Sequence, residues 1–335
     1  MTVRIDDFLG IEAGAIDDLV SRGASPGCAM AVSSPEGRFE FASGTYSDVD
    51  RRQTSTHTLY DVASITKLFT TALVLRLFDE GKASLEERMN EYLPHFKDSA
   101  LTVRDLLTHR ARMICEPLSK MAIETPNIFA LAERIPVSPA ASAHFFYQNA
   151  TFLFLGMLVE KLRGKAFADC LLEIIRELGL RETRIGSENG LDAPPTEIRR
   201  GEVWANKTHD ESSYLCGGVT GYAGIFASAC DLVQFGRAWL DFKIASPETT
   251  GKAFTNYGEY PGEEQGLGWF NTLPRFPALS GDIFCHSGYT GPLLAVNPKK
   301  SRVYALCCNR TYYGRGNRLY RELWAYMLAS EPAGR

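Results

Sequence analysis

Several patterns that would assign this 335-residue chain to a familiar class of protein are missing from its sequence. It has no run of basic residues, and its formal net charge of −4 argues against a nucleic-acid surface. No apolar run approaches the ~18 residues that are needed to cross a bilayer. We therefore expect no nucleic-acid partner and no membrane span.

Two groups of catalytic and metal-binding patterns are missing as well. Without Gly-x-Ser-x-Gly, the nucleophile turn of an α/β-hydrolase is not expected. Without His-Glu-x-x-His or paired Cys-x-x-Cys, no metal site is indicated. The sequence thus predicts no cofactor and no metal, which leaves chemistry carried by side chains alone.

The first residues lack the features of a secretory signal. Asp6 and Asp7 stand where such a signal has a basic region followed by an apolar core. Eight cysteines are scattered without metal-ligand spacing, and without an export signal the reduced state is favoured over disulfides. We expect a cytoplasmic protein, or a periplasmic one if this sequence is a processed form.

What the sequence does contain begins with Ser64 and Lys67, three residues apart. The segment 68–75 that follows has apolar residues at helical spacing, so Ser64 is expected near a helix N-terminus, with Lys67 one turn later. Residues at i and i+3 share a face of a helix. A serine becomes a nucleophile when a base takes its proton, and a partly buried lysine with a lowered pKa can be that base.

Two more short motifs follow this Ser-x-x-Lys pattern. Tyr147-Gln148-Asn149 opens a second helical stretch that runs from Phe152 to Arg163. His286-Ser287-Gly288 ends a strand-like run and leads into Tyr289. Taken singly, each motif is common by chance. An Asn that caps a helix and a His at the end of a strand are the plainer interpretations.

In this order, Ser-x-x-Lys, Tyr-x-Asn and His-x-Gly resemble the serine penicillin-recognising family. That family includes class C β-lactamases, D-alanyl-D-alanine carboxypeptidases, other penicillin-binding proteins and β-lactamase-like esterases. The motif set with Ser-Asp-Asn and Lys-Thr-Gly is a related variant. The resemblance extends over about residues 25 to 325, with Gly221 to Ser228 among the similar segments.

The resemblance implies an acyl-enzyme mechanism. Ser64 attacks a carbonyl, and Lys67 accepts or relays the proton. Tyr147 shares the proton transfer, which requires its pKa to fall, and a nearby Lys67 ammonium would promote that fall. Asn149 binds the substrate's amide carbonyl and helps to position Lys67.

The motif at the strand end supplies the expected substrate-binding residues. Backbone N–H groups of Ser64 and Tyr289 would form the oxyanion hole. His286, Ser287 and Gly288 stand beside it, with His286 where many relatives have a lysine that helps to bind a carboxylate. As an imidazolium it would do the same only at low pH. Arg112 is a second candidate for that positive charge.

The expected fold is α+β and β-lactamase/transpeptidase-like, with an antiparallel sheet from both chain ends, helices flanking it and a mostly helical insert. Residues 1–78 and 222–335 would form the sheet domain and 79–221 the helical domain, with the active site between them. Strands are expected outside the insert, at 28–33 and 38–43 near the start and at 268–273, 282–286, 293–296 and 303–308 near the end. An N-terminal amphipathic segment and a closing helix would cover the sheet.

The polar, glycine-rich stretch 186–224 is predicted to be one long connection, of a length that is unusual unless it lines a site. His209 and Asp210 within it are expected to fix the loop, and His109 is expected to be structural.

Two functions remain open from sequence. The first is a serine hydrolase that acts on a small-molecule amide or ester, either a β-lactam, a D-amino-acid peptide or a small carboxylic ester. The second is a receptor or scaffold that keeps the fold and has lost turnover. Intact Ser64, Lys67, Tyr147 and Asn149 favour the enzyme, and the sequence carries no signal for the oligomeric state.

Overall fold

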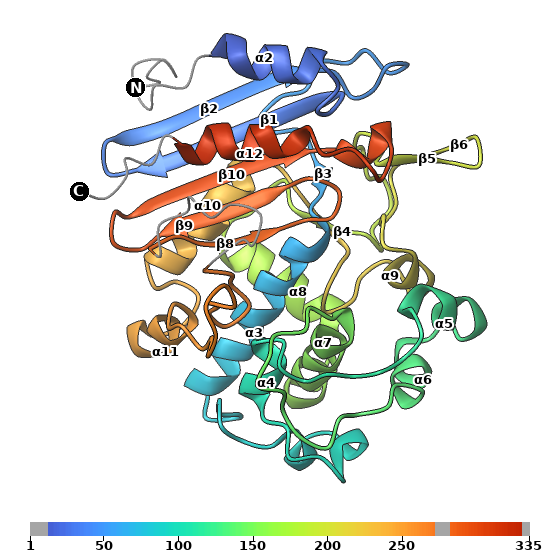
Figure 1. Ribbon diagram of the computed structural model, residues 1–335, viewed down its shortest axis with the longest axis vertical. Coiled ribbons are helices and arrows are strands. Elements are labelled where there is room, and N and C mark those ends of the chain that lie inside the picture. Colours follow the sequence, from blue (N-terminus) through green and yellow to red (C-terminus); the bar gives the residue numbers. More distant parts are fainter. Residues whose placement is uncertain (1–12, 272–281, 330–335) are drawn as a thin grey trace.

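The computed structural model describes residues 13–271 and 282–329. A five-stranded antiparallel sheet from both ends of the chain lies at one end of the molecule (Figure 1), in the order β2-β1-β10-β9-β8. Its strands are β1 (Gly27–Ser34), β2 (Gly37–Gly44), β8 (Phe284–Ser287), β9 (Leu293–Asn297) and β10 (Arg302–Cys308). The expected α+β fold is confirmed.

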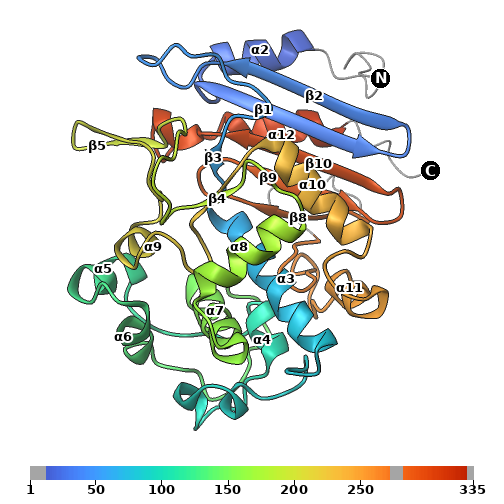
Figure 2. The same cartoon turned by 180° about the vertical axis from the view of Figure 1, so that it is seen from behind.

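Helices cover both faces of this sheet, and Figures 1 and 2 show the two sides. They are α2 (Ala13–Ser21), α10 (Ala229–Leu240) and α12 (Tyr320–Ala329). Alternate residues of β1 point to opposite faces. Met30 and Val32 are buried in the cluster that contains residues of α2 and α12, whereas Ala29 and Ala31 belong to the core on the α10 side. The sheet is therefore the wall between two apolar cores.

The rest of the molecule is mostly helical. Its helices are α3 (Thr66–Asp79), α4 (Val103–Leu107), α5 (Leu118–Glu124), α6 (Ile128–Glu133), α7 (Asn149–Arg163), α8 (Phe167–Glu177) and α11 (Pro247–Ala253). Helix α7 ends where expected, because Gly164 takes a left-handed φ of 66°. A small sheet of β3 (Tyr60–Asp61), β7 (Ile225–Ala227) and β4 (Arg184–Ile185) lies beside them.

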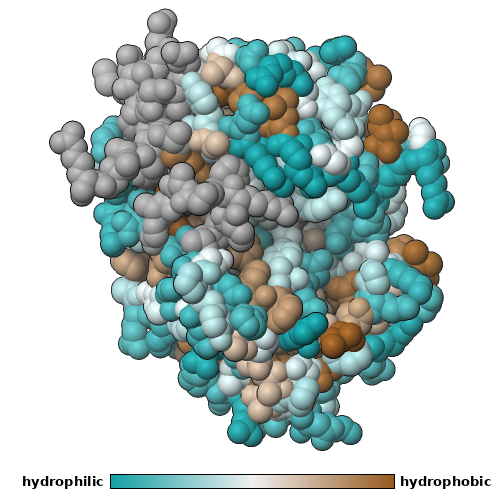
Figure 3. Space-filling view, viewed as in Figure 1, coloured by the Kyte–Doolittle hydropathy of each residue, from teal (hydrophilic) through white to brown (hydrophobic). Residues whose placement is uncertain are grey.

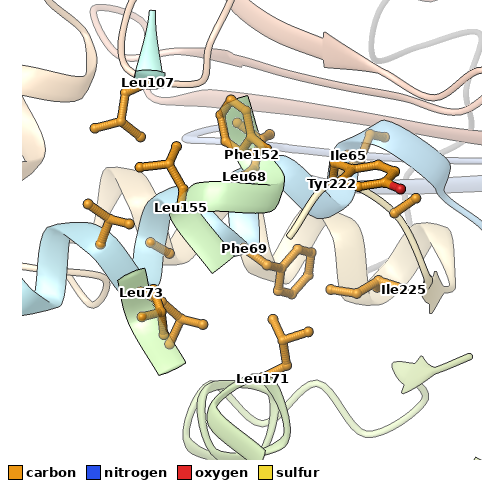
Figure 4. Packing of buried hydrophobic residues seen from close by; sticks show 14 of the residues in the cluster. Ile65, Leu68, Phe69, Leu73, Leu107, Phe152, Leu155, Leu171, Tyr222 and Ile225 are labelled. Carbon is orange, nitrogen blue, oxygen red and sulfur yellow. The ribbon is translucent and has the colours of Figure 1, made fainter. Parts of the chain in front are cut away.

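Helix α3 is the centre of the helical part. Nearly all of its side chains are buried, as expected of a helix with apolar contacts on all sides. Figure 4 shows its Leu68, Phe69 and Leu73 among side chains from other elements, including Phe152 of α7 and Leu171 of α8. The helix that carries Lys67 is therefore fixed by packing on every side.

The stretch 186–224 is not a structureless connection. It contains the hairpin β5 (Glu197–Arg199) and β6 (Glu202–Trp204) and the short helix α9 (Glu211–Leu215). The Asp210 side chain caps α9 by accepting from Ser213 N at 2.8 Å. The backbone N–H of His209 donates to Asp61 Oδ2 at 2.6 Å. Both residues fix the loop, as expected.

Two expected elements are only partly described. Ile5, Phe8 and Leu9 of the N-terminal amphipathic segment lie outside the described residues, as do residues 272 and 273 of the expected strand. In the described part of that run, Phe270 forms isolated bridges with Gln265 and Cys285 rather than a strand of the sheet.

No helix in the described ranges is long and apolar enough to cross a membrane. The face in Figure 3 is largely hydrophilic, with hydrophobic residues in separate patches.

Candidate active site

Ser64 lies on a strained turn between β3 and α3. The turn is a single 3-10 turn, Ala63–Ile65, and Ala63 has a φ of 47°, which is uncommon for a residue other than glycine. The buried carboxylate of Asp61 holds the turn, because its Oδ1 accepts from Ala63 N at 2.8 Å. Strain of this kind persists where the surrounding structure enforces it, and it is common at functional sites.

Lys67 brings the predicted catalytic residues together. Its side chain is fully buried, and Nζ lies 3.1 Å from Ser64 Oγ, 2.9 Å from the Tyr147 hydroxyl and 2.9 Å from Asn149 Oδ1. The carbonyl oxygen of Tyr222, next to β7, is 3.4 Å away. The start of α3, the start of α7 and the segment before β7 therefore meet at one amine.

Burial lowers the pKa of Lys67 to about 7, although the nearby carboxylate of Asp210 acts in the opposite direction. A neutral amine has two N–H donors and one lone pair. Since Asn149 Oδ1 and the carbonyl of Tyr222 can only accept, they take the donors. The lone pair then remains for the proton of the Ser64 hydroxyl.

The expected fall in the pKa of Tyr147 is wrong. Burial of the hydroxyl raises its pKa above the usual value, although 44% of the residue's surface is exposed. With a pKa of about 7, Lys67 is neutral at higher pH, and it then supplies no positive charge that would lower the pKa of Tyr147. Tyr147 therefore keeps its proton at neutral pH.

The structure leaves His286 uncharged near pH 7, in line with the expectation that it is an imidazolium only at low pH. The residue is fully buried at the end of β8, and its ring packs 4.6 Å from that of Phe270 and 6.3 Å from that of Tyr147. Burial, and then the neighbouring Lys67, lower the pKa of His286 to about 3. It is neutral near pH 7 and does not line the cavity described below.

The strand end after His286 docks against the turn before Ser64. A Cβ atom on Gly288 would lie 2.5 Å from Val62 O, so this close approach requires glycine. Thr290 Oγ1 donates to Asp61 O at 2.7 Å. The backbone N–H groups of Ser64 and Tyr289 have no hydrogen-bond partner within the described part of the chain.

These residues open onto a cavity of about 610 Å³. The sequence-predicted residues in its wall are Ser64, Tyr147, Asn149, Ser287, Gly288 and Tyr289. Acidic side chains also line the cavity, among them Asp210 and Glu263. The sequence did not predict either residue as a substrate contact.

Three arginines line the same cavity, Arg310, Arg315 and Arg318. Arg315 pairs with Glu197 and Glu211, whereas Arg318 forms no ion pair with an acidic residue in the ranges described. Arg112, the cation suggested by sequence, is exposed against the Phe146 ring and does not line the cavity. Asn309-Arg310 is among the segments that resemble the family, whereas Arg315 and Arg318 carry no short motif that would have marked them.

Comparisons with known proteins find similar sequences and similar structures. A putative D-alanyl-D-alanine carboxypeptidase of Escherichia coli K12 is 26% identical over 309 residues, covering 77% of this chain and 70% of that protein. A class C β-lactamase structure superposes with a TM-score of 0.77 at 18% identity, covering all of both chains. A D-amino acid amidase from Ochrobactrum anthropi superposes with a TM-score of 0.72 at 19% identity, covering 97% of this chain and 98% of that one.

At such identities the two structures establish the fold alone. The family model described as Beta-lactamase matches residues 13–326, which is nearly the whole chain. With the fold, the Ser64–Lys67 pair and this match in agreement, the chain belongs to the beta-lactamase family.

Proposed function

We propose that the protein is a serine hydrolase that cleaves an amide or ester bond through a covalent acyl-enzyme on Ser64. The observation that carries the proposal is the buried Lys67 amine, which touches Ser64 Oγ, the Tyr147 hydroxyl and Asn149 Oδ1. With a pKa of about 7, this amine is poised to take a proton at neutral pH.

In acylation, Ser64 Oγ attacks the substrate carbonyl while its proton moves to Lys67 Nζ. The backbone N–H groups of Ser64 and Tyr289 stabilise the oxyanion. The protonated Lys67 then passes its proton to Tyr147, as the Tyr147 hydroxyl gives its own to the leaving amine or alcohol. Because the pKa of Tyr147 is raised, it acts as a protonated relay and not as a phenolate.

In deacylation, the same groups transfer protons in the reverse direction, with a water molecule in place of the leaving group. Lys67 is neutral again, and it withdraws a proton through Tyr147 from a water molecule that attacks the ester carbonyl. Ser64 Oγ leaves with a proton from Lys67. No group outside the cluster is needed to close the cycle.

The cavity supports a small charged or polar substrate. A substrate carboxylate would lie near Arg318 or Arg310, the two cavity arginines that form no ion pair with an acidic residue in the described residues, rather than at the neutral His286. The candidates are a β-lactam, a D-amino-acid peptide and a small ester, and a relative is described as a putative D-alanyl-D-alanine carboxypeptidase. A panel of nitrocefin, D-alanyl-D-alanine peptides and short p-nitrophenyl esters separates them.

Intact-mass spectrometry tests the nucleophile. After incubation with a penicillin and, separately, with a fluorophosphonate, we expect one adduct on the wild-type protein and none on Ser64→Ala. Asn149→Ala serves as a control that keeps Ser64 while removing a contact of Lys67, and we expect it to label more slowly. An adduct that persists in Ser64→Ala places the nucleophile elsewhere. No labelling of folded wild-type protein by either reagent favours the receptor or scaffold instead.

A further inference from the structure

Three potential metal ligands converge at a place that the acyl-transfer site does not use. They are Glu40 on β2, His57 in the segment between β2 and β3, and Cys230 in the first turn of α10. One carboxylate oxygen, one imidazole nitrogen and the sulfur lie within 4.8 Å of one another. None of the three residues lines the cavity at Ser64.

From this cluster we propose that Glu40, His57 and Cys230 bind a zinc ion. Tetrahedral zinc has bonds of about 2.3 Å to sulfur and about 2.0–2.2 Å to nitrogen and oxygen, so its ligand atoms lie about 3.4–3.6 Å apart. Closing the cluster to that size takes shifts of about 1 Å, within the reach of side-chain rotation. Three protein ligands leave the fourth position to water.

A residue outside the cluster prepares His57 for this role. Glu182 Oε1 hydrogen-bonds His57 Nδ1, and the Ser228 hydroxyl donates to the other oxygen of Glu182. A carboxylate on Nδ1 fixes the tautomer that keeps Nε2 free as a ligand, and it orients the ring, as outer-shell carboxylates do for zinc-binding histidines. The His57 side chain is 63% exposed, which gives an ion a path from solvent to the buried Cys230.

The donor set selects the class of cation. Thiolate, imidazole and carboxylate together suit Zn²⁺, whereas Mg²⁺ and Ca²⁺ prefer oxygen ligands alone. Binding Zn²⁺ forms the Zn–S bond and releases the thiol proton to water.

Two neighbouring side chains also contact the Glu40 carboxylate, and neither of them prevents a metal ion from binding there. Arg38 Nε pairs with Oε1 at 2.6 Å, and the Thr56 hydroxyl donates to Oε2 at 3.1 Å. A carboxylate has about four acceptor sites on its two oxygens, so either contact can remain beside a metal bond. The Arg38 side chain is 44% exposed and free to turn outward.

The test is metal titration of the whole chain, tag-free, reduced and stripped of metal. With Co²⁺ as the probe, we expect a thiolate-to-cobalt charge-transfer band that saturates at one equivalent and disappears when Zn²⁺ is added. Cys230→Ser and His57→Ala should each lose the band, and Glu182→Gln should weaken the affinity by about 10- to 100-fold. Zn²⁺ should also raise the melting temperature of the wild type, because it binds the folded state.

Matched controls are Cys115→Ser and His144→Ala, which remove another cysteine and another exposed histidine that contacts a glutamate. Both should keep the band and the affinity. Absence of a charge-transfer band in the wild type overturns the proposal, as does undiminished affinity in His57→Ala, whose exposed side chain can be removed without disturbing the core.

Discussion

At the residue scale, the chemistry depends on where one amine is buried. Lys67 has no exposed surface and lies among oxygen atoms from Ser64, Tyr147, Asn149 and Tyr222. Desolvation penalises its charged form more than Asp210 favours it. A lysine that would be a permanent cation in water therefore becomes a base near neutral pH.

This burial predicts a pH profile. For a neutral ester, kcat/KM should rise through a pKa of about 7 and then level off, because the free enzyme needs Lys67 deprotonated to accept the Ser64 proton. Below that pKa the amine is protonated and the rate should fall about tenfold per pH unit. Initial rates with a p-nitrophenyl ester, from about two pH units below that pKa to about two above it, give the curve.

His286→Gln is the control for that profile. Since the pKa of His286 is lowered to about 3, the imidazole is already neutral over the whole range, and the variant should keep the position of the limb. A limb that vanishes in His286→Gln would assign the ionisation to the imidazole. A rate that is still rising tenfold per pH unit at the top of the range would mean that Lys67 is a solvated cation with the pKa of a free lysine, about 10.4.

The sequence predicted these residues better than it predicted their charge states. Motif order was enough to propose that Ser64, Lys67, Tyr147 and Asn149 meet. The protonation of Tyr147 and His286 depends on burial by residues far along the chain, such as Phe270. No local pattern encodes that desolvation, so the expected fall in the pKa of Tyr147 was wrong and the size of the shift at His286 was not predicted.

At the element scale, the end of β8 and the turn before α3 work as one unit. Gly288 lies against the carbonyl of Val62, and Thr290 donates to Asp61 O. The proposed oxyanion donors, at Ser64 and Tyr289, come from the two sides of this contact. Their spacing is therefore set by how closely the two backbones approach.

Gly288→Ala should move the two proposed oxyanion donors apart. The added Cβ would lie 2.5 Å from a backbone oxygen, so one of the two segments must move. A displacement of about 1 Å at a reacting centre costs about 100-fold in rate, and we expect a loss of that order in kcat/KM. Steady-state kinetics on the best substrate measure it, with circular dichroism to confirm the fold.

Gly251→Ala is the matched control. Gly251 lies inside α11, where an added Cβ would meet nothing within 4 Å, and alanine favours a helix, so activity should be unchanged. Equal activity of Gly288→Ala and wild type would show that the contact does not set the site.

Elements with strong periodicity were predictable, and short ones were not. Strands β1, β2, β9 and β10 alternate or run apolar between turn signals, and they form within a residue or two of the expected positions. The hairpin β5–β6 and helix α9 went unrecognised in a polar stretch. Helix α9 depends on the Asp210 cap and on the His209–Asp61 contact, which the local sequence does not reveal.

At the scale of the whole molecule, the central strands of the sheet come from opposite ends of the chain. Met30 of β1 lies directly opposite Leu306 of β10, and both are buried in the cluster under α2 and α12. The sequence predicted this shared sheet. The division into a sheet domain and a helical domain stays a prediction.

Leu306→Ala should therefore destabilise the molecule as a whole. Deleting a fully buried leucine side chain costs about 2–5 kcal/mol in free energy of unfolding, and hydrolysis should be lost in the same urea transition as the fold. Urea unfolding followed by fluorescence and by residual activity measures both. Val49→Ala, at an exposed position, should change stability by less than about 0.5 kcal/mol. A hydrolytic activity that survives the transition would show that the sheet and the active site do not unfold as one cooperative unit.

The pairing of β1 with β10 also has a consequence for biosynthesis. A ribosome that adds roughly 5–20 residues per second completes the β1–β2 hairpin tens of seconds before it reaches residues 302–308. During that interval the inner edge of β1 has no strand beside it. Such an edge is a template for other chains, so the nascent protein is exposed to aggregation until residues 302–308 have been translated. Contacts so distant in sequence also place the folding of this molecule among the slow ones.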